Sequence, residues 1–138
     1  MDKALNYLAL ARKGGMAELG EEPVSAITRT GKGYLVLVAS DASDHTWRRA
    51  KSFVAGTQQQ CIRLSFTKDE LGFAVGRTSL AIAAITDPAL ALALVKALPD
   101  PEKHKAAIEV LEAKAKKLRQ RQKEAQAHKR NVRMGKKK

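Results

Sequence analysis

A short and continuously apolar run constrains the fold of this 138-residue chain more than any other feature. Residues 34–39 read Tyr-Leu-Val-Leu-Val-Ala, contain no Gly or Pro, and are followed by the polar turn Ser40-Asp41. A run this short and this apolar predicts a central β-strand covered on both faces, and therefore a sheet that lies between helices. In such α/β sheets, the loops at the carboxyl ends of the strands usually face the ligand.

Helical and extended patterns alternate on both sides of this strand. Helices are predicted for residues 2–13, 20–31, 43–55, 67–75 and 87–98, and further strands for residues 16–19, 61–66 and 80–85, the first of them at an edge. Ser43 is suited to cap the third helix, and Thr67 with Glu70 forms the capping-box pattern that starts the fourth. The alternation predicts an α/β fold, a three-layer α/β/α sandwich with a mixed sheet of four strands.

The segment Pro99-Asp100-Pro101 separates the predicted sandwich domain, residues 1–98, from a second region, residues 99–138. Residues 102–128 contain no Gly or Pro and predict a basic C-terminal helix, whereas a disordered tail is expected from His128 to Lys138. A heptad-like spacing, with mostly small or apolar residues, runs along the helix at Ile108, Leu111, Ala115, Leu118, Gln122 and Ala125 and weakens after Leu118. The spacing is compatible with a solvated or loosely docked helix, a coiled-coil partner surface, or a helix that forms along RNA.

The formal net charge of +12 indicates a polyanionic partner, nucleic acid rather than a membrane. Residues 1–101 hold 12 Lys and Arg against 10 Asp and Glu, whereas residues 102–138 hold 14 against 4. No apolar run approaches the roughly 18 residues of a membrane span, and the N-terminus lacks the layout of a signal peptide. The single Cys61 cannot form an internal disulfide and is expected to be a buried strand residue. These features predict a cytoplasmic protein.

Catalytic and metal-binding patterns are weak in this sequence. Ser43-Asp44-His45 contains the residue types of a hydrolase triad, but adjacent residues cannot face one another on a helix or strand. The three histidines are isolated from cysteines and carboxylates at ligand spacing, which argues against a metal site. Gly31-Lys32-Gly33 precedes a strand rather than a helix, which is the wrong context for phosphate binding. We therefore expect no enzyme, no catalytic residue, no metal and no cofactor.

Two short segments are candidate binding loops. Gly20, Glu21 and Glu22 lie at the predicted start of the second helix, where backbone N–H groups and the helix dipole favour anions. Their carboxylates would serve RNA only by accepting hydrogen bonds from amino groups of bases; the alternative is simple complementation of the helix dipole. The second segment, residues 77–79, offers one cation and two hydroxyls, or is an ordinary polar turn. In the expected topology the two segments lie close together.

The order of several motifs resembles the kink-turn-binding ribosomal protein family, the L seven Ae-like superfamily, and within it the small bacterial YlxQ-type branch. The resemblance covers roughly residues 2–98. The motifs are Ala-Arg-Lys-Gly-Gly at 11–15, Gly-Glu-Glu at 20–22, Leu-Val-Leu-Val-Ala-Ser-Asp-Ala at 35–42, Thr-Lys-Asp-Glu-Leu-Gly at 67–72 and Ala-Ile-Thr-Asp at 84–87. The family implies an α/β/α sandwich that binds kink-turn RNA, with the start of the second helix on tandem sheared G·A pairs and the loop before the last strand on a flipped-out nucleotide.

Carried over by position, the resemblance implies RNA contacts at the helix start and at the loop. These residues are Gly20, Glu21, Glu22 and Pro23, and Arg77, Thr78, Ser79 and Leu80. The family's Asn-Glu-x-x-Lys pattern is replaced here by Glu22-Pro23-Val24-Ser25-Ala26. Absence of the lysine removes a direct interaction of about 1–3 kcal/mol, and Arg29 and Lys32 are candidates for electrostatic compensation.

These observations predict a monomeric RNA-binding protein of ribosome assembly or translation. Its partner would be structured RNA, with ribosomal RNA favoured and ribosomal proteins as further candidates, and its basic tail would add phosphate affinity that falls steeply with salt. The alternative is a protein-interaction adaptor that uses the C-terminal helix as its partner surface. An RNA-modifying enzyme is less favoured, since similar domains occur as substrate-binding appendages but no catalytic domain is present.

Overall fold

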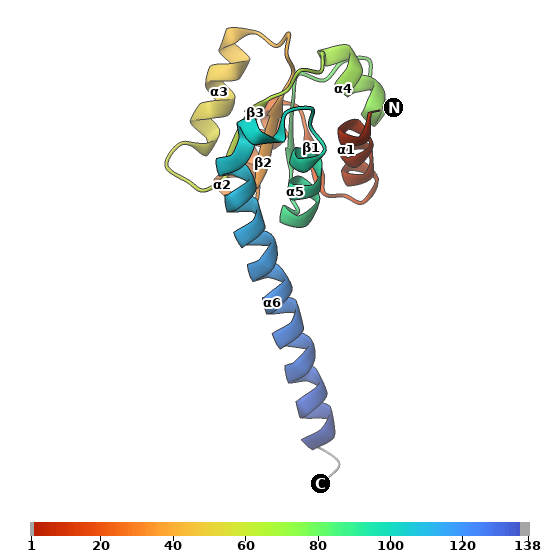
Figure 1. Cartoon of the computed structure of the whole chain (residues 1–138), viewed down its shortest axis with the longest axis vertical. Coiled ribbons are helices and arrows are strands. Elements are labelled where there is room, and N and C mark those ends of the chain that lie inside the picture. The colour runs from red at the N-terminus through yellow and green to blue at the C-terminus, as the bar shows by residue number, and fades with distance from the viewer. Residues whose placement is uncertain (1, 136–138) are drawn as a thin grey trace.

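The computed structural model describes residues 2–135, and the side chains of residues 2–129 (Figure 1). Its elements are α1 Lys3–Lys13, β1 Ala17–Leu19, α2 Glu21–Arg29, β2 Leu35–Val38, α3 Asp44–Val54, β3 Gln60–Arg63, α4 Lys68–Val75, β4 Ile82–Ile85, α5 Pro88–Lys96, the 3-10 helix η1 Pro101–His104 and α6 Lys105–Gly135. Every helix and strand expected between residues 2 and 98 is present, with ends that differ by a few residues.

The four strands form one mixed sheet in the order β1-β4-β2-β3. β2 runs parallel to β3, whereas β4 runs antiparallel to both β1 and β2. All four residues of β2 are buried, which confirms the interior strand predicted from its unbroken apolar run. β1 lies at an edge of the sheet, as its short length indicated.

Helices cover both faces of the sheet and give the predicted three layers. α2 and α3 pack together in one layer, against β1 and β4 and against β2 and β3 respectively. α1, α5 and the beginning of α6 form the other layer, and α4 packs on α1. The fold is therefore a three-layer α/β/α sandwich with a four-stranded mixed sheet.

The predicted caps hold the ends of the helices. The Ser43 hydroxyl accepts a hydrogen bond from the Thr46 N–H at 3.1 Å, so Ser43 caps α3 as predicted. Thr67 and Glu70 form the reciprocal capping box of α4, with bonds of 3.2 and 3.1 Å. α4 ends at Gly76, whose φ of 75° is the left-handed conformation that glycine adopts without strain.

The buried core continues past residue 98 into α6. Ala107, Leu111 and Ala115 are 7%, 1% and 3% exposed and pack toward the sandwich. An ion pair of 3.6 Å between Lys96 and Glu112 also joins α5 to α6. Side chains on both sides of residue 98 therefore pack together. That residues 1–98 fold as an independent unit stays a prediction.

The C-terminal helix extends further than the sequence analysis predicted. α6 continues to Gly135, whereas disorder was expected from His128. The difference has a local cause, since no Gly or Pro interrupts residues 102–134 and strong helix formers fill most positions. The rest of that prediction, residues 136–138, lies outside the described residues. Within residues 2–135, no helix is both long enough and apolar enough to cross a membrane.

Candidate nucleic-acid interface

The two predicted binding segments meet at one end of the sheet. We call this the upper end, where β1 and β2 finish and β4 begins (top of the domain in Figure 1). The Gly20 N–H, directly after β1, donates to the Ile82 carbonyl at 3.0 Å, and Ala39, directly after β2, donates to the Ala81 carbonyl at 2.9 Å. The start of α2 is therefore adjacent to the first residue of β4, and residues 77–79 precede β4 at the same end of the sheet.

Gly20 sets the direction in which α2 leaves the sheet. Its φ of 99° lies in the region that favours glycine, and no side chain caps the helix there. The Glu21 carboxylate forms an ion pair with Arg49 of α3, whereas the Glu22 side chain is exposed. Of the two carboxylates, Glu22 is therefore the better placed to meet a ligand, whereas Glu21 is paired with Arg49 across α2 and α3.

The second segment, residues 77–79, is exposed and rests directly on α4. The Arg77 N–H donates to the Gly72 carbonyl at 2.8 Å, and the Leu80 N–H donates to the Lys68 carbonyl at 3.0 Å. Leu80 is only 3% exposed, so it anchors the loop from beneath while Arg77, Thr78 and Ser79 form its surface.

Gly72 allows this close approach, and the sequence analysis did not identify it. A Cβ at position 72 would lie 2.7 Å from the Ser79 nitrogen and 2.8 Å from the Arg77 carbonyl oxygen, both of them backbone atoms. A glycine in the middle of a short helix lowers the stability of that helix. Its presence in the sequence could therefore have indicated a tight backbone contact at this position.

Arg29 and Lys32 are not part of the upper end. Arg29 ends α2, about 12 Å along the helix from Glu21 at about 1.5 Å per residue. Lys32 precedes β2, whose first residue, Leu35, pairs with Ile85 at the far end of β4. We call this opposite end of the sheet the lower end. The structure thus separates these two cations from the helix start that they were expected to support.

The lower end is held by a buried glutamine. The Gln59 side-chain oxygen accepts from the Gly33 N–H at 2.8 Å, and its nitrogen donates to the Thr28 carbonyl at 3.1 Å. The Gly33 N–H in the turn at residues 31–33 is therefore bonded within the protein. The same contacts fix the position of Lys32 beside β2.

Aromatic and cationic side chains gather between α3 and β3. The Lys51 ammonium and the Arg63 guanidinium lie 5.2 and 5.7 Å from the Trp47 ring centre. Arg63 also donates to the carbonyls of Ser40 and Ala42, at 3.3 and 3.1 Å, and so secures the loop after β2. Arg63 was not among the predicted site residues, because its partners lie more than 20 positions away in the sequence.

Two further features of the domain are the thiol of Cys61 and the arrangement of side chains of metal-ligating types. Burial raises the pKa of the Cys61 thiol to about 12, although nearby Lys51 acts in the opposite direction. Among residues 2–129, no three His, Cys, Asp or Glu side chains are grouped so that they could hold a metal ion.

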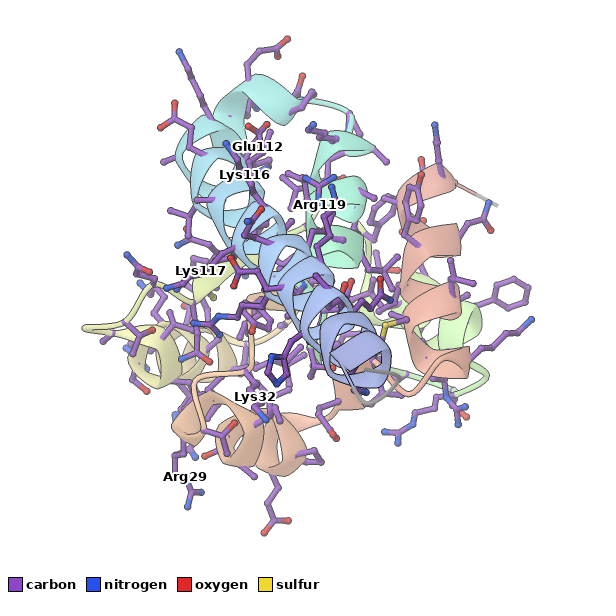
Figure 2. All side chains as sticks on the ribbon, turned by 90° about the horizontal axis from the view of Figure 1, so that it is seen from below. Arg29, Lys32, Glu112, Lys116, Lys117 and Arg119 are labelled. Carbon is purple, nitrogen blue, oxygen red and sulfur yellow. The ribbon has the colours of Figure 1, made fainter. Side chains whose placement is uncertain are left out.

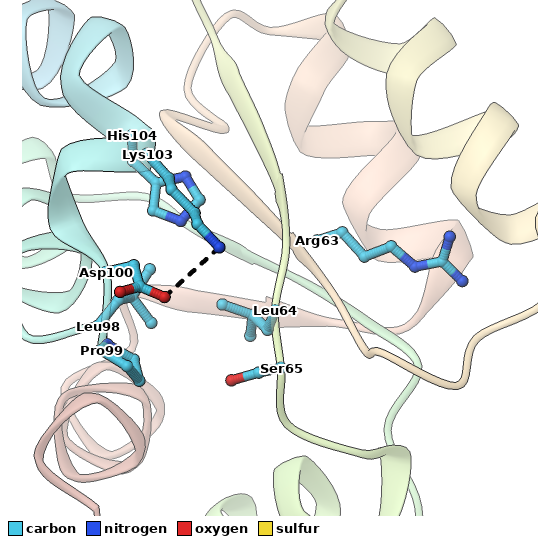
Figure 3. A pocket seen from close by; sticks show the side chains of 8 residues that line it. All are labelled: Arg63, Leu64, Ser65, Leu98, Pro99, Asp100, Lys103 and His104. Carbon is cyan, nitrogen blue, oxygen red and sulfur yellow. Dashed lines mark ion pairs between the residues drawn. The ribbon is translucent and has the colours of Figure 1, made fainter.

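One pocket lies where the end of β3 meets the chain entering η1, between Arg63 and Lys103 (Figure 3). Its volume of about 160 Å³ is below the roughly 300–1,000 Å³ of pockets that enclose drug-sized ligands. An ion pair of 3.5 Å between Lys103 and Asp100 lies at its edge. The pocket marks the junction of η1 with the upper end of the sheet.

The architecture and the upper end define a class of small α/β/α sandwich in which a glycine-started helix and an exposed polar loop share one surface. No protein-family model matches the sequence. The chain is 33% identical over 75 residues to the RNA-binding protein YlxQ of Enterococcus faecium, which covers 54% of this chain and 72% of that protein. It therefore belongs to the YlxQ-type branch of the L seven Ae-like superfamily, as the motifs indicated.

Two solved structures share the fold. A protein of unknown function from Bacillus halodurans C has a TM-score of 0.66 and 25% sequence identity, and the match covers 70% of this chain and 97% of that chain. The 15.5kD RNA binding protein of Giardia lamblia has a TM-score of 0.59 and 19% identity, covering 75% of this chain and 85% of that chain. The second likeness shows a common fold only.

Proposed function

We propose that this protein binds structured RNA through its upper end and prefers RNA that contains a kink-turn. The observation that carries the proposal is that the α2 start and the loop at residues 77–79 lie at the same end of the sheet, where the Gly20 N–H donates to the Ile82 carbonyl at 3.0 Å. Membership in a family whose Enterococcus faecium relative is named an RNA-binding protein supports it. The proposed setting is ribosome assembly or translation in the cytoplasm, with ribosomal RNA as the ligand.

The side chains at the upper end match different parts of an RNA. The exposed Glu22 carboxylate is suited to accept hydrogen bonds from base amino groups, as carboxylates do in nucleic-acid recognition. The Arg77 guanidinium and the hydroxyls of Thr78 and Ser79 are suited to phosphate and sugar oxygens around an unstacked nucleotide. Backbone N–H groups at the start of α2 favour a phosphate beside the base contact.

The alternative role, an adaptor that pairs through the C-terminal helix, has less support. Leu111 and Ala115 are the residues that a coiled coil would need, and both are already buried within this protein. A partner helix could take their place only by separating α6 from α5.

A gain-of-function substitution tests the RNA contact. Ala26 is exposed on α2, stands where the family pattern has a lysine, and lies four residues after Glu22 on the same side of the helix. We expect Ala26→Lys to tighten binding to kink-turn RNA by about 5- to 150-fold, the equivalent of about 1–3 kcal/mol. A matched duplex without the sheared pairs should gain far less.

Ala89→Lys is the matched control, because Ala89 is an exposed helical alanine on α5. It adds the same charge away from the upper end and should change both affinities equally and slightly. Glu22→Gln should reduce the preference for the kink-turn, whereas Glu109→Gln on α6 should not. Equal gains from the two lysine substitutions, together with no effect of Glu22→Gln, would contradict the proposal.

A further inference from the structure

We propose that the protein holds two RNA segments at once, one at the upper end and a second along the protruding part of α6 together with Arg29 and Lys32. This inference rests on the proposed function for the first segment. At the second surface, the proposed ligand is the phosphate backbone of an RNA duplex of any sequence. The protein would then bridge two parts of a folded RNA, or two RNA molecules.

The path of α6 separates the two surfaces. Its entry, η1, lines the pocket of Figure 3 beside Arg63 and Ser65, at the upper end of β3. Ten residues later, Lys114 lines a pocket with Gly31 and Tyr34 at the lower end. α6 therefore runs along the sheet from its upper to its lower end and then continues beyond the sandwich (Figure 1).

Charge divides along the helix at the same point. Residues 105–115 hold two lysines and two glutamates, whereas residues 116–135 hold eight lysines and arginines against one glutamate. Every described side chain from Arg119 to Lys129 is exposed. Figure 2 looks onto the lower end and shows Arg29 and Lys32 on the side of α2 and, apart from them in this view, the first cations of the protruding part of α6, Lys116, Lys117 and Arg119.

Distance prevents these cations from strengthening the contact at the upper end. Residues 116–135 extend about 30 Å at about 1.5 Å per residue, and they point away from Gly20. Interactions between exposed charges are largely screened beyond about 8 Å at physiological salt. The cations therefore require phosphates of their own, from RNA that lies below the sandwich.

The composition of the protruding helix favours RNA over a membrane or a partner helix. Residues 119–129 contain no Leu, Ile, Val, Phe, Met or Trp, so this stretch of the helix lacks the apolar face that binding to a lipid surface requires. For the same reason it offers no apolar seam to a coiled coil. Its cations also project in several directions, since Lys116, Lys117, Arg119 and Arg121 are separated by about 100° per residue. A phosphate-lined surface that surrounds the helix fits this distribution.

Bridging is tested with the full chain and two RNAs. A biotinylated kink-turn RNA is fixed on beads, and a fluorescent duplex without sheared pairs is supplied in solution with the protein. The native chain should retain the duplex on the beads. The variant in which Lys116, Lys117, Arg119, Arg121 and Lys123 are all replaced by Gln should still bind the kink-turn RNA but retain at least 10-fold less duplex. A variant with Lys3, Arg12 and Lys13 of α1 replaced by Gln removes three positive charges from the sandwich and should behave like the native chain.

Several results would overturn the proposal. Equal retention by the five-glutamine and native proteins would place the second RNA elsewhere. A parallel loss of both RNAs would indicate one continuous site, and complexes with two proteins per RNA pair, measured by sedimentation, would assign bridging to a dimer. Displacement of the duplex by anionic phosphatidylserine vesicles at equal phosphate concentration would favour a membrane. If the native protein links two plain duplexes as well as it links a kink-turn to a duplex, bridging stands while the proposed kink-turn preference fails.

Discussion

The sandwich and the protruding part of α6 are built on opposite principles. In the sandwich, apolar side chains are buried between layers, and residues 1–101 are close to charge balance, with 12 cations against 10 anions. In residues 116–135 cations outnumber anions eight to one, and no described side chain beyond Leu118 is buried. The first region owes its structure to contacts within the protein. The second owes its helical form to local propensity and has its charges available for a partner.

Burial and charge both change along the chain at a point other than the predicted boundary. Sequence punctuation at Pro99-Asp100-Pro101 suggested a boundary at residue 98, yet Ala107, Leu111 and Ala115 are buried against the sandwich. By burial and by charge, the change occurs near residue 116. Substitutions before residue 116 should therefore change mainly the stability of the protein. Substitutions after it should change mainly the affinity for RNA.

The largest effect on stability is expected at Leu111, where α6 packs on the sandwich. Leu111→Ala should lower the free energy of unfolding by about 2–5 kcal/mol, because a fully buried leucine leaves a cavity when it is shortened. Denaturant unfolding measures the change, and Leu118→Ala, at a half-buried position beyond the packed part, serves as the control. A decrease below about 0.5 kcal/mol at Leu111 would mean that α6 is not part of the core.

A smaller effect is expected at Gly72. Gly72→Ala should cost about 1–3 kcal/mol, because the new methyl group meets backbone atoms of the loop rather than a flexible side chain. It should also displace residues 77–79 and reduce the preference for kink-turn RNA. Phe73→Ala, at the adjacent exposed position of α4, is the control for changes on this helix. Unchanged stability and unchanged preference would show that the loop does not depend on the close approach to Gly72.

Cys61 provides a test of packing in the sandwich through pH. The ordinary pKa of the thiol is 9.0 and burial raises it to about 12 in the folded protein. Between these values the unfolded chain releases the proton and the folded protein retains it, so the unfolding free energy should fall as pH rises above about 9. The pH dependence should be weaker in Cys61→Ala, measured by denaturant unfolding from pH 8 to about 11. Equal slopes would indicate that the thiol is not buried.

The smallest effect on stability is expected in the protruding helix. Replacing Lys116, Lys117, Arg119, Arg121 and Lys123 by Gln removes five exposed charges but no packing, so each change should alter the unfolding free energy by less than about 0.5 kcal/mol. Denaturant unfolding in the absence of RNA provides the measurement. A large decrease would show that these residues pack on the sandwich and would remove the contrast between the two regions.

Much of the fold could be predicted from local sequence, because its elements are set by local rules. The unbroken apolar run of β2, the Ser43 cap and the Thr67-Glu70 capping box depend on residues close together in the chain. The helix-start and loop segments could also be placed at one end of the sheet, because the expected strand order brings them there.

The rest depends on contacts between distant residues. The tight approach to Gly72, the hold of Arg63 on the loop after β2, and the burial of Leu111 arise only when the elements are assembled. Arg29 and Lys32 were expected to support the helix start, but the direction of α2 carries them to the lower end. The spacing of residues in the sequence predicts on which face of a helix a side chain lies. It does not predict at which end of the sheet that side chain lies.

The most direct test of the account is the salt dependence of RNA binding by the native chain and the five-glutamine variant. Kink-turn RNA and its matched duplex without sheared pairs are titrated at several salt concentrations. We predict that the affinity for the kink-turn RNA changes by less than about two-fold between proteins, a difference of about 0.4 kcal/mol, whereas the affinity for the duplex falls in the variant. The slope of log affinity against log salt concentration should be shallower in the variant. The decrease should be up to about 0.9 for each phosphate that the substituted side chains no longer neutralise. A variant whose preference disappears, or whose salt slope matches that of the native chain, would contradict the assignment of recognition to the upper end and of phosphate binding to α6.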